Sequence, residues 1–351
     1  MVVDLEFFFC QDYHSARQNF LAASKEVNAS MQSLQHQQFP ELFCDVSILE
    51  KSSQQALVTI SGTHGIEGYC GSAIQTNLLK QQQHNLPREL FQVHIHSLNP
   101  WGMQYLSRCN EDNIDLNRNC LDFSQPLPVN PFYPLIHPLI DVPVWEQPQQ
   151  EQFWTFYQSF VSKYGLATWN QAFSGGQYDY PNGVMFGGLS PSWSHQILEQ
   201  VINSLPENLD CIVVIDFHSG VGRFAHELIF VAHSSQNALQ KLSKIKKDKI
   251  LIYSHNNLAI NTDNISGLLV NKFAQYFPQK CLSLVVEYGT YNHQIMIEAI
   301  IKDRWNRYHS ERSDRSEREF LLNWYSPAHP YWRKQVIAQS LDLITKLFSA
   351  S

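Results

Sequence analysis

The sequence has no excess of basic residues and a low content of charged residues. Its 351 residues include 25 Lys and Arg against 32 Asp and Glu, so the formal net charge is -7. A chain with this charge has no basic surplus to neutralise phosphates, and we expect no nucleic-acid partner. No apolar run approaches the length that spans a bilayer, and we expect no membrane partner either.

Cysteine is present, but in no recognisable pattern. The seven cysteines form no Cys-x-x-Cys pair, and an odd number in a long chain does not suggest a disulfide framework. Acidic residues near the N-terminus stand where a secretory signal would carry Lys or Arg. These features lead us to expect a cytoplasmic protein with reduced thiols, and they leave its oligomeric state open. A content of 44% hydrophobic and 13% aromatic residues excludes a disordered chain.

Apolar runs alternate with helical stretches along the chain. Several runs are continuous, which is typical of central strands covered on both faces. The predicted strands are residues 46–49, 56–60, 91–98, 211–217, 228–232, 250–254 and 281–286. The predicted helices are residues 15–35, 68–81, 193–204, 236–246 and 266–277. This alternation predicts an α/β fold with a mostly parallel sheet, interrupted by irregular insertions near 122–150 and 174–190.

The motif His64-x-x-Glu67 directly follows the strand predicted at 56–60. At this spacing, an imidazole and a carboxylate lie on one face of the first turn of a helix, so a single cation can bind both. Gly62 and Gly65 permit an abrupt turn between strand and helix. Because the chain has 15 His, the motif is also compatible with the start of an ordinary surface helix.

A catalytic zinc site needs a third protein ligand, and His218 is the best candidate. It follows the strand predicted at 211–217, and α/β sheets bind ligands outside the carboxyl ends of their strands. Glu287 follows the strand predicted at 281–286, so a carboxylate reaches the same edge and can act as a general base. Alternatively, His218 is a hydrogen-bonded core residue and Glu287 an ordinary charge at a strand end.

A polar segment at 108–119 supplies further candidate residues. Asp115 can accept the second N–H group of a metal-bound histidine, and Arg118 can hold a carboxylate through two parallel hydrogen bonds. The same residues are also compatible with an Asx-turn and a surface ion pair.

Four blocks of the sequence together resemble the zinc carboxypeptidase A-like superfamily. They are His64-x-x-Glu67, Asp115-Leu116-Asn117-Arg118, Asp216-Phe217-His218 and Val286-Glu287-Tyr288-Gly289. The Asp-x-His and Glu-x-Gly patterns look closer to the succinylglutamate desuccinylase and aspartoacylase branch. The fuller strings around the first two blocks are most similar to an uncharacterised bacterial group of the same clan. The resemblance implies a single three-layer α/β/α domain over residues 1–351 with a mostly parallel mixed central sheet.

The resemblance also implies roles for individual residues. His64, Glu67 and His218 would bind one zinc ion. Glu287 would deprotonate the metal-bound water and then protonate the leaving nitrogen. Arg108 would polarise the scissile carbonyl and stabilise the oxyanion.

The remaining implied roles concern the substrate. Asn117 and Arg118 would bind its carboxylate, with Asp115 behind the metal ligands. Carboxypeptidases also close the pocket with a tyrosine ahead of the catalytic glutamate. Tyr253 and Tyr276 are the candidates by position.

The expected function is that of a zinc-dependent hydrolase cleaving an amide bond next to a free carboxylate. Its substrate would be either a short peptide, as for a metallocarboxypeptidase, or an N-acyl amino acid. The turn-rich insertion at 174–190 either covers the site or forms a surface loop. A non-catalytic metal-binding or peptide-binding protein on the same scaffold is the alternative. A serine hydrolase at Ser61 or Ser219 is disfavoured, because the sequence lacks Gly-x-Ser-x-Gly.

Overall fold

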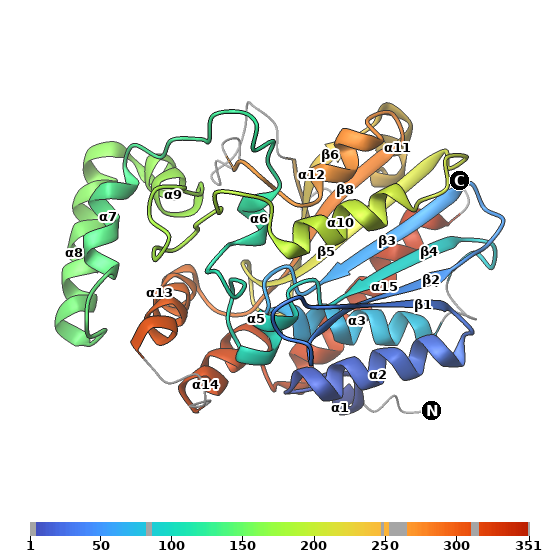
Figure 1. Ribbon diagram of the computed structural model, residues 1–351, viewed down its shortest axis with the longest axis horizontal. Coiled ribbons are helices and arrows are strands. Elements are labelled where there is room, and N and C mark those ends of the chain that lie inside the picture. Colours follow the sequence, from blue (N-terminus) through green and yellow to red (C-terminus); the bar gives the residue numbers. More distant parts are fainter. Residues whose placement is uncertain (1–4, 82–85, 247–248, 253–264, 310–315, 350–351) are drawn as a thin grey trace.

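A computed structural model describes residues 5–81, 86–246, 249–252, 265–309 and 316–349 of the chain. Its centre is a sheet of eight strands in the order β1-β2-β4-β3-β5-β8-β6-β7 (Figure 1). The strands are β1 (Ser30–Gln35), β2 (Phe43–Leu49), β3 (Gln55–Ser61), β4 (Phe91–His96), β5 (Cys211–Gly220), β6 (Glu227–Ser234), β7 (Ile250–Ile252) and β8 (Cys281–Gly289). The helices are α1 (Leu5–Phe8), α2 (Tyr13–Glu26), α3 (Gly68–Lys80), α5 (Pro100–Tyr105), α6 (Leu116–Asn119), α7 (Tyr133–Ile140), α8 (Gln147–Tyr164), α9 (Leu166–Ser174), α10 (Trp193–Asn203), α11 (Gln236–Leu242), α12 (Asn271–Tyr276), α13 (His293–His309), α14 (Ser316–Tyr325) and α15 (Pro330–Phe348).

Four neighbouring strands in the middle of the sheet are parallel. β4 pairs with β3, β3 with β5, and β5 with β8, all in parallel. The flanking pairs β1·β2, β2·β4 and β6·β8 are antiparallel. The prediction of a mixed, mostly parallel sheet is confirmed. Because β3, β5 and β8 run in the same direction, the residues that follow them meet at one edge of the sheet.

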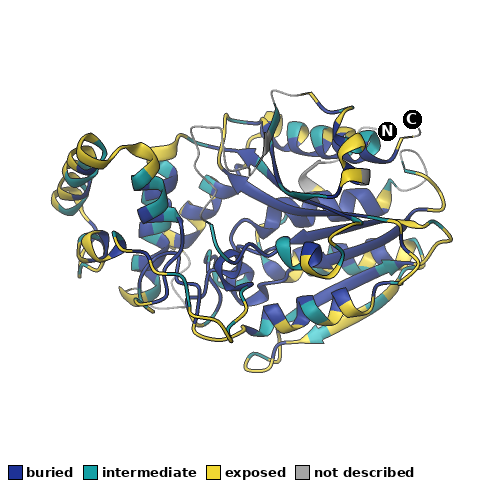
Figure 2. Cartoon of the chain, turned by 90° about the horizontal axis from the view of Figure 1, so that it is seen from above, coloured by how far each residue is buried: buried dark blue, intermediate teal, exposed yellow. Residues whose placement is uncertain are grey.

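Helices cover both faces of the sheet, which gives the predicted α/β/α layers. On one face, α3, α11 and α15 pack against the inward side chains of β5, β6 and β8, including Val213, Ile229 and Leu284. On the other face, α10 and α12 pack against a second set that includes Val214 and Val285. Figure 2 shows the strands as buried between helices whose outer faces are exposed. The continuous apolar runs of the sequence are therefore strands that are buried on both sides.

A helical arm extends beyond the sheet and is formed by α7, α8 and α9 (Figure 1). Aromatic residues that include Phe153, Phe160 and Trp169 pack it together, and Ile297 and Ile301 of α13 join the same cluster. The prediction of an irregular segment at 122–150 is therefore wrong in part, because α7 and the start of α8 lie within it. Its prolines obscured the helices, although Pro134 and Pro148 stand in first turns, where proline is tolerated.

The N-terminal helix prediction is also wrong in part. Residues 15–35 do not form one helix, because α2 ends at Glu26 and Asn28 has a φ of 54°. The chain then reverses, and β1 pairs antiparallel with β2 at the edge of the sheet. Four of its six residues are polar and most are exposed, and the spacing of Met31 and Leu34 is not the alternation typical of a strand.

The other predicted elements are found, with shifts at their ends. The helix predicted at 266–277 begins only at Asn271, and that predicted at 236–246 ends at Leu242. Of the strand predicted at 250–254, residues 250–252 form β7, whereas Tyr253 lies outside the described residues. In the described part of the chain, no helix is both long and apolar enough to cross a membrane.

Candidate metal centre

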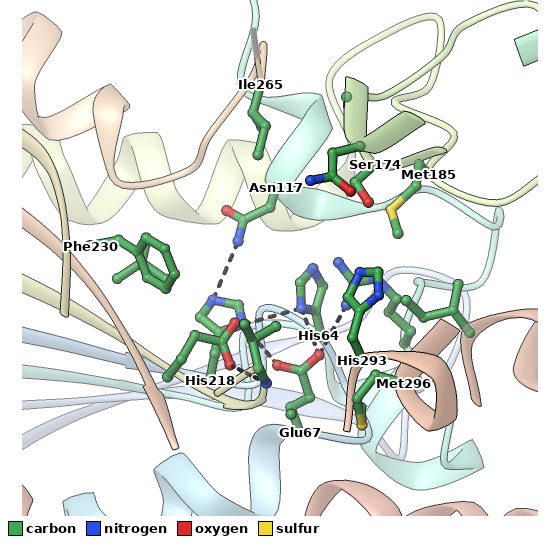
Figure 3. A pocket seen from close by; sticks show the side chains of 18 of the residues that line it. His64, Glu67, Asn117, Ser174, Met185, His218, Phe230, Ile265, His293 and Met296 are labelled. Atoms are coloured by element: carbon green, nitrogen blue, oxygen red, sulfur yellow. Dashed lines mark hydrogen bonds and ion pairs between the residues drawn. The ribbon is translucent and has the colours of Figure 1, made fainter. Parts of the chain in front are cut away.

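The ends of two adjacent parallel strands, β3 and β5, bring the predicted ligands together. His64 and Glu67 lie in the turn that joins β3 to α3, and His218 lies near the end of β5. Figure 3 shows their side chains converging on one point. Nitrogen and oxygen atoms of the three residues lie within 4.8 Å of one another, and all three residues are buried. The structure therefore places together the three residues that the sequence singled out as ligands.

Two glycines make the turn after β3 possible. Gly62 has a φ of 73°, a conformation that other residues adopt with strain. Gly65 lies against the backbone of Gly102, so that a Cβ atom there would be 2.1 Å from a backbone carbon. The chain can therefore fold back tightly and present His64 just before the helix, with Glu67 at the N-cap of α3.

The two histidines face the same point through the same ring atom. His64 Nδ1 lies 3.1 Å from His218 Nδ1 and 2.9 Å from a carboxylate oxygen of Glu67. His218 Nδ1 lies 2.9 Å from the other oxygen of Glu67. Two nitrogens bound to one tetrahedral zinc at about 2.0–2.1 Å would lie about 3.3 Å apart. The observed separation of the nitrogens fits a shared metal ion.

Carboxylates hold the outer ring nitrogens of both histidines. His64 Nε2 lies 3.1 Å from Asp115 Oδ1, and His218 Nε2 lies 2.8 Å from Asp216 Oδ2. Each carboxylate can accept an Nε2–H group, and in that tautomer the Nδ1 lone pair is directed at the common point. Thr63 Oγ1 donates to the other oxygen of Asp216 at 2.8 Å. Asp115 therefore lies directly behind the ring of His64, on the side away from Glu67.

Sequence reasoning gave Asp216 no role of its own, although its motif contained the signal. In a strand, residues i and i+2 point to the same face. Asp-x-His within β5 therefore sets the carboxylate beside the histidine ring.

The electrostatics of the cluster favour an ionised carboxylate. Burial alone would raise the pKa of Glu67, but His64 and His218 hold this pKa well below its ordinary value. Burial likewise disfavours ionisation of Asp115, yet the charges of Arg108 and His64 keep its pKa well below normal. A metal ligand must be deprotonated, and Glu67 meets that condition at neutral pH.

Arg108 bridges the two acidic residues of the site. Its NH1 donates to Glu67 Oε1 at 3.0 Å, and its Nε and NH2 donate to Asp115 Oδ2 at 3.2 and 3.1 Å. Its backbone N–H donates to Asp303 Oδ2 at 2.7 Å, which ties the segment to α13. The guanidinium therefore lies at the edge of the metal cluster in a fixed orientation.

Glu287 lies on the strand next to the candidate ligand His218. The two residues are register partners in the parallel β5·β8 pair. Glu287 Oε2 accepts the backbone N–H of Val221 at 3.4 Å, and it is not part of the three-residue ligand cluster. Burial, with repulsion from Glu67, raises the pKa of Glu287 to about 7. A carboxylate with this pKa can accept and return a proton near neutral pH.

Asn117 and Arg118 border the cluster from α6. Asn117 Nδ2 lies 3.3 Å from His218 Nε2, and its Oδ1 accepts the N–H of Leu269. The guanidinium of Arg118 donates to the carbonyl oxygens of Ser174 and Asn117. The structure thus brings Arg118 to the site, but it also gives this side chain a role in holding the segment that begins at 174.

A cavity of about 460 Å³ opens onto the cluster. Its lining contains Glu67, Arg108, Asn117, Arg118 and Glu287, and it extends toward the helical arm. The lining residues from the arm and from α13 are Tyr157, Leu166, Asn170, Gln171, Ser174, His293, Met296 and Ile300. Sequence reasoning missed this wall, because no motif links helices that are distant along the chain from the ligands.

The insertion at 174–190 forms part of the cavity wall. Ser174, Gly175 and Met185 line the cavity. Most of the segment is buried, and Asn113 Nδ2 donates to the carbonyl of Gly183 at 2.8 Å. Tyr276, a candidate for closing the pocket, is 43% exposed on α12 and does not line the cavity.

A model of the family DUF2817, described as a protein of unknown function, matches residues 9–339 of the chain. This match confirms the resemblance to an uncharacterised family that the sequence motifs indicated. No match was found among curated proteins.

Several solved structures are similar to this chain. A candidate metallopeptidase from Shewanella amazonensis is 13% identical, with 90% of this chain and 94% of that chain covered and a TM-score of 0.44. A metallo-carboxypeptidase from Burkholderia cenocepacia is 11% identical, with 84% of this chain and 67% of that chain covered and a TM-score of 0.41. Bovine thrombin-activatable fibrinolysis inhibitor, solved with tick carboxypeptidase inhibitor, is 9% identical, with 93% of this chain and 97% of that chain covered and a TM-score of 0.48. At these identities, the chemistry of the present site has to follow from its own residues.

We predict that the protein binds one metal ion per chain through His64, Glu67 and His218. After reconstitution with Zn²⁺ and removal of excess metal, elemental analysis should find about one zinc in the wild type and a large loss in His218→Ala. His137→Ala, which removes a buried histidine outside the site, should keep the metal. Only trace zinc in the reconstituted wild type, or full zinc in His218→Ala, would contradict this ligand set.

Proposed function

This chain belongs to the DUF2817 family, and we propose that it is a zinc-dependent hydrolase that cleaves an amide bond next to a free carboxylate. One observation carries the proposal. Glu287, a carboxylate of raised pKa, lies outside the three-residue cluster but directly beside His218 on the neighbouring strand. A protein that only stores a metal ion has no use for a proton acceptor at this position.

Glu287 and Arg108 divide the catalytic work in this proposal. When bound, zinc makes water more acidic and polarises a carbonyl group. Glu287 takes the proton of the attacking water and returns it to the leaving nitrogen. Arg108 lines the cavity at the edge of the cluster, where its positive charge stabilises the developing oxyanion.

Asn117 and Arg118 are the proposed binding residues for the substrate carboxylate. Both line the cavity, and an Arg guanidinium matches a carboxylate geometrically. A cavity of about 460 Å³ is in the size range of sites for small molecules. These features support a short peptide or an N-acyl amino acid as the substrate.

The role of Glu287 predicts the behaviour of Glu287→Gln. Glutamine keeps the shape of the side chain but cannot accept the proton of water, so turnover should fall at least about 100-fold while zinc content stays unchanged. Hydrolysis of N-acyl amino acids and dipeptides, measured beside elemental analysis, provides the check.

The matched control is Glu199→Gln, which alters a glutamate of α10 outside the cavity and should keep full activity. Unchanged turnover in Glu287→Gln would remove Glu287 from the mechanism. Loss of zinc in this variant would instead make Glu287 a ligand.

The role of Arg118 predicts a selective effect of Arg118→Lys. An ammonium group cannot reproduce the planar pair of hydrogen bonds to a carboxylate. For substrates with a free carboxylate, kcat/KM should therefore fall roughly tenfold to hundredfold, whereas slow amidated analogues should be almost unaffected.

The ratio of kcat/KM for free-carboxylate substrates to kcat/KM for amidated analogues distinguishes carboxylate binding by Arg118 from its contact with the Ser174 carbonyl. If Arg118 only holds the segment at 174, the two classes of substrate should lose activity together. Such a result, or a wild-type preference for amidated substrates, would refute carboxylate binding by Arg118.

A further inference from the structure

We propose that Asp303 of α13 is a positioning residue, which holds Arg108 in the orientation that its guanidinium needs to stabilise an oxyanion. This inference rests on the proposed function, because that function gives Arg108 its work in the cavity. Asp303 is not among the described residues that line the cavity, and it acts through its contacts with the segment 107–110.

The Asp303 carboxylate accepts hydrogen bonds from two consecutive residues. The backbone N–H of Arg108 donates to Asp303 Oδ2 at 2.7 Å, and Ser107 Oγ donates to the same oxygen at 3.2 Å. Asp303 is 5% exposed and Ser107 is 2% exposed, so water has little access to these groups. A hydrogen bond from an N–H group to a carboxylate is stronger than one to a neutral acceptor. Asp303 therefore fixes the backbone of Arg108 relative to α13.

Arg307 lies one turn further along α13 and holds the rest of the segment. Its NH2 donates to Ser107 Oγ at 2.9 Å, and to the carbonyl oxygens of Asn110 and Cys109 at 2.8 and 3.3 Å. Residues four apart lie on one face of a helix, so Asp303 and Arg307 contact the segment together. The charge of Arg307 also opposes the rise that burial causes in the pKa of Asp303.

The same stretch of backbone also contacts the turn that carries two candidate metal ligands. The carbonyl of Arg108 accepts the N–H of Gly65 at 3.1 Å, and the carbonyl of Ser107 accepts the N–H of Ile66 at 3.0 Å. Both donors lie in the sequence between His64 and Glu67. The backbone at 107–108 is therefore held between α13 and this turn, and α13 sets the place of Arg108 relative to the metal site.

Loss of the Asp303 carboxylate would leave the buried N–H group of Arg108 without its acceptor. An unpaired buried donor is costly, so the segment has to shift until water or another group accepts this N–H. The hydrogen bonds to the turn at 64–67 do not involve Asp303 and remain. The metal should therefore stay bound, while the guanidinium of Arg108 takes a changed position.

The helix that anchors Arg108 is also part of the cavity wall. His293, Met296 and Ile300 of α13 line the cavity, and Figure 3 shows His293 and Met296 on the same side of the metal cluster. The wall beside the substrate and the cation that stabilises the oxyanion therefore share one support. Fixed distances of this kind matter, because a displacement of about 1 Å can lower a rate about 100-fold.

Kinetics of the zinc-loaded full-length protein test this role. In Asp303→Ala, kcat for N-acyl amino acids or dipeptides should fall at least about tenfold, with KM changed less than about threefold and zinc content unchanged. Asp303→Asn keeps an oxygen that can accept the N–H of Arg108, so it should recover most of kcat. Unchanged kcat in Asp303→Ala, or an equal loss in Asp303→Asn, would overturn the proposal.

Two further variants separate this role from general effects on folding. Asp303→Glu keeps the charge but moves the acceptor oxygen by one methylene group, so it should also lose kcat, and it replaces Asp303→Ala if that variant does not fold. Asp45→Ala removes another buried carboxylate with polar partners, outside the cavity, and should keep kcat. Full kcat in Asp303→Glu, or an equal loss in Asp45→Ala, would contradict the role of Asp303.

A double-mutant cycle tests whether Asp303 acts through Arg108. Arg108→Ala alone should lower kcat about 100-fold or more, and adding Asp303→Ala should lower it further by less than about threefold. Losses that multiply would show that Asp303 does not act through Arg108.

Binding of a tetrahedral compound tests the inference without turnover. In the Glu287→Gln background, Asp303→Ala should weaken calorimetric binding of N-(methylphosphonyl)phenylalanine at least about tenfold, and that of planar N-acetylphenylalanine less than about threefold. Equal weakening of both compounds, or no binding of the phosphonyl compound to Glu287→Gln itself, would refute the proposal. The expected difference in binding, without hydrolysis of any substrate by the wild type, would refute the hydrolase and leave the role of Asp303 in place.

Discussion

The approach of two histidine nitrogens to each other is the constraint on which this site depends. His64 Nδ1 and His218 Nδ1 lie 3.1 Å apart beside the carboxylate of Glu67. If the carboxylates behind both rings accept the Nε2–H groups, then two lone pairs face each other in a buried place. A cation bound by both nitrogens removes this repulsion. The backbone around the two histidines keeps their rings in the orientation that such a cation needs.

The sheet topology and the loop contacts maintain that approach. Parallel pairing of β3, β5 and β8 delivers His64, His218 and Glu287 to one edge. Arg108 joins Glu67 to Asp115, so these two carboxylates are positioned together. The site is therefore built as one connected network, in which a change in one carboxylate shifts the orientation of a ligand.

The grouping of His64, Glu67 and His218 was predictable from the sequence, because these residues follow or end continuous apolar runs whose strands are parallel neighbours. Continuous apolar runs identified the buried strands, and His218 and Glu287 follow directly from their places at strand ends. The edge strand β1 was not predictable, since most of its residues are polar and the spacing of Met31 and Leu34 is not that of a strand. The cavity wall from α8, α9 and α13 depends on packing between helices far apart along the chain. The hydrogen bonds from Arg118 to the Ser174 carbonyl likewise have no signal in either segment.

A crystal structure with anomalous diffraction measured at the zinc absorption edge tests the central claim most directly. It should show one strong peak bound by Nδ1 of His64, Nδ1 of His218 and the carboxylate of Glu67. Asp115 and Asp216 should still contact the Nε2 atoms, and Glu287 should lie beside the ion without binding it. A peak elsewhere, coordination through the Nε2 atoms, or no peak from zinc-reconstituted protein would contradict the account.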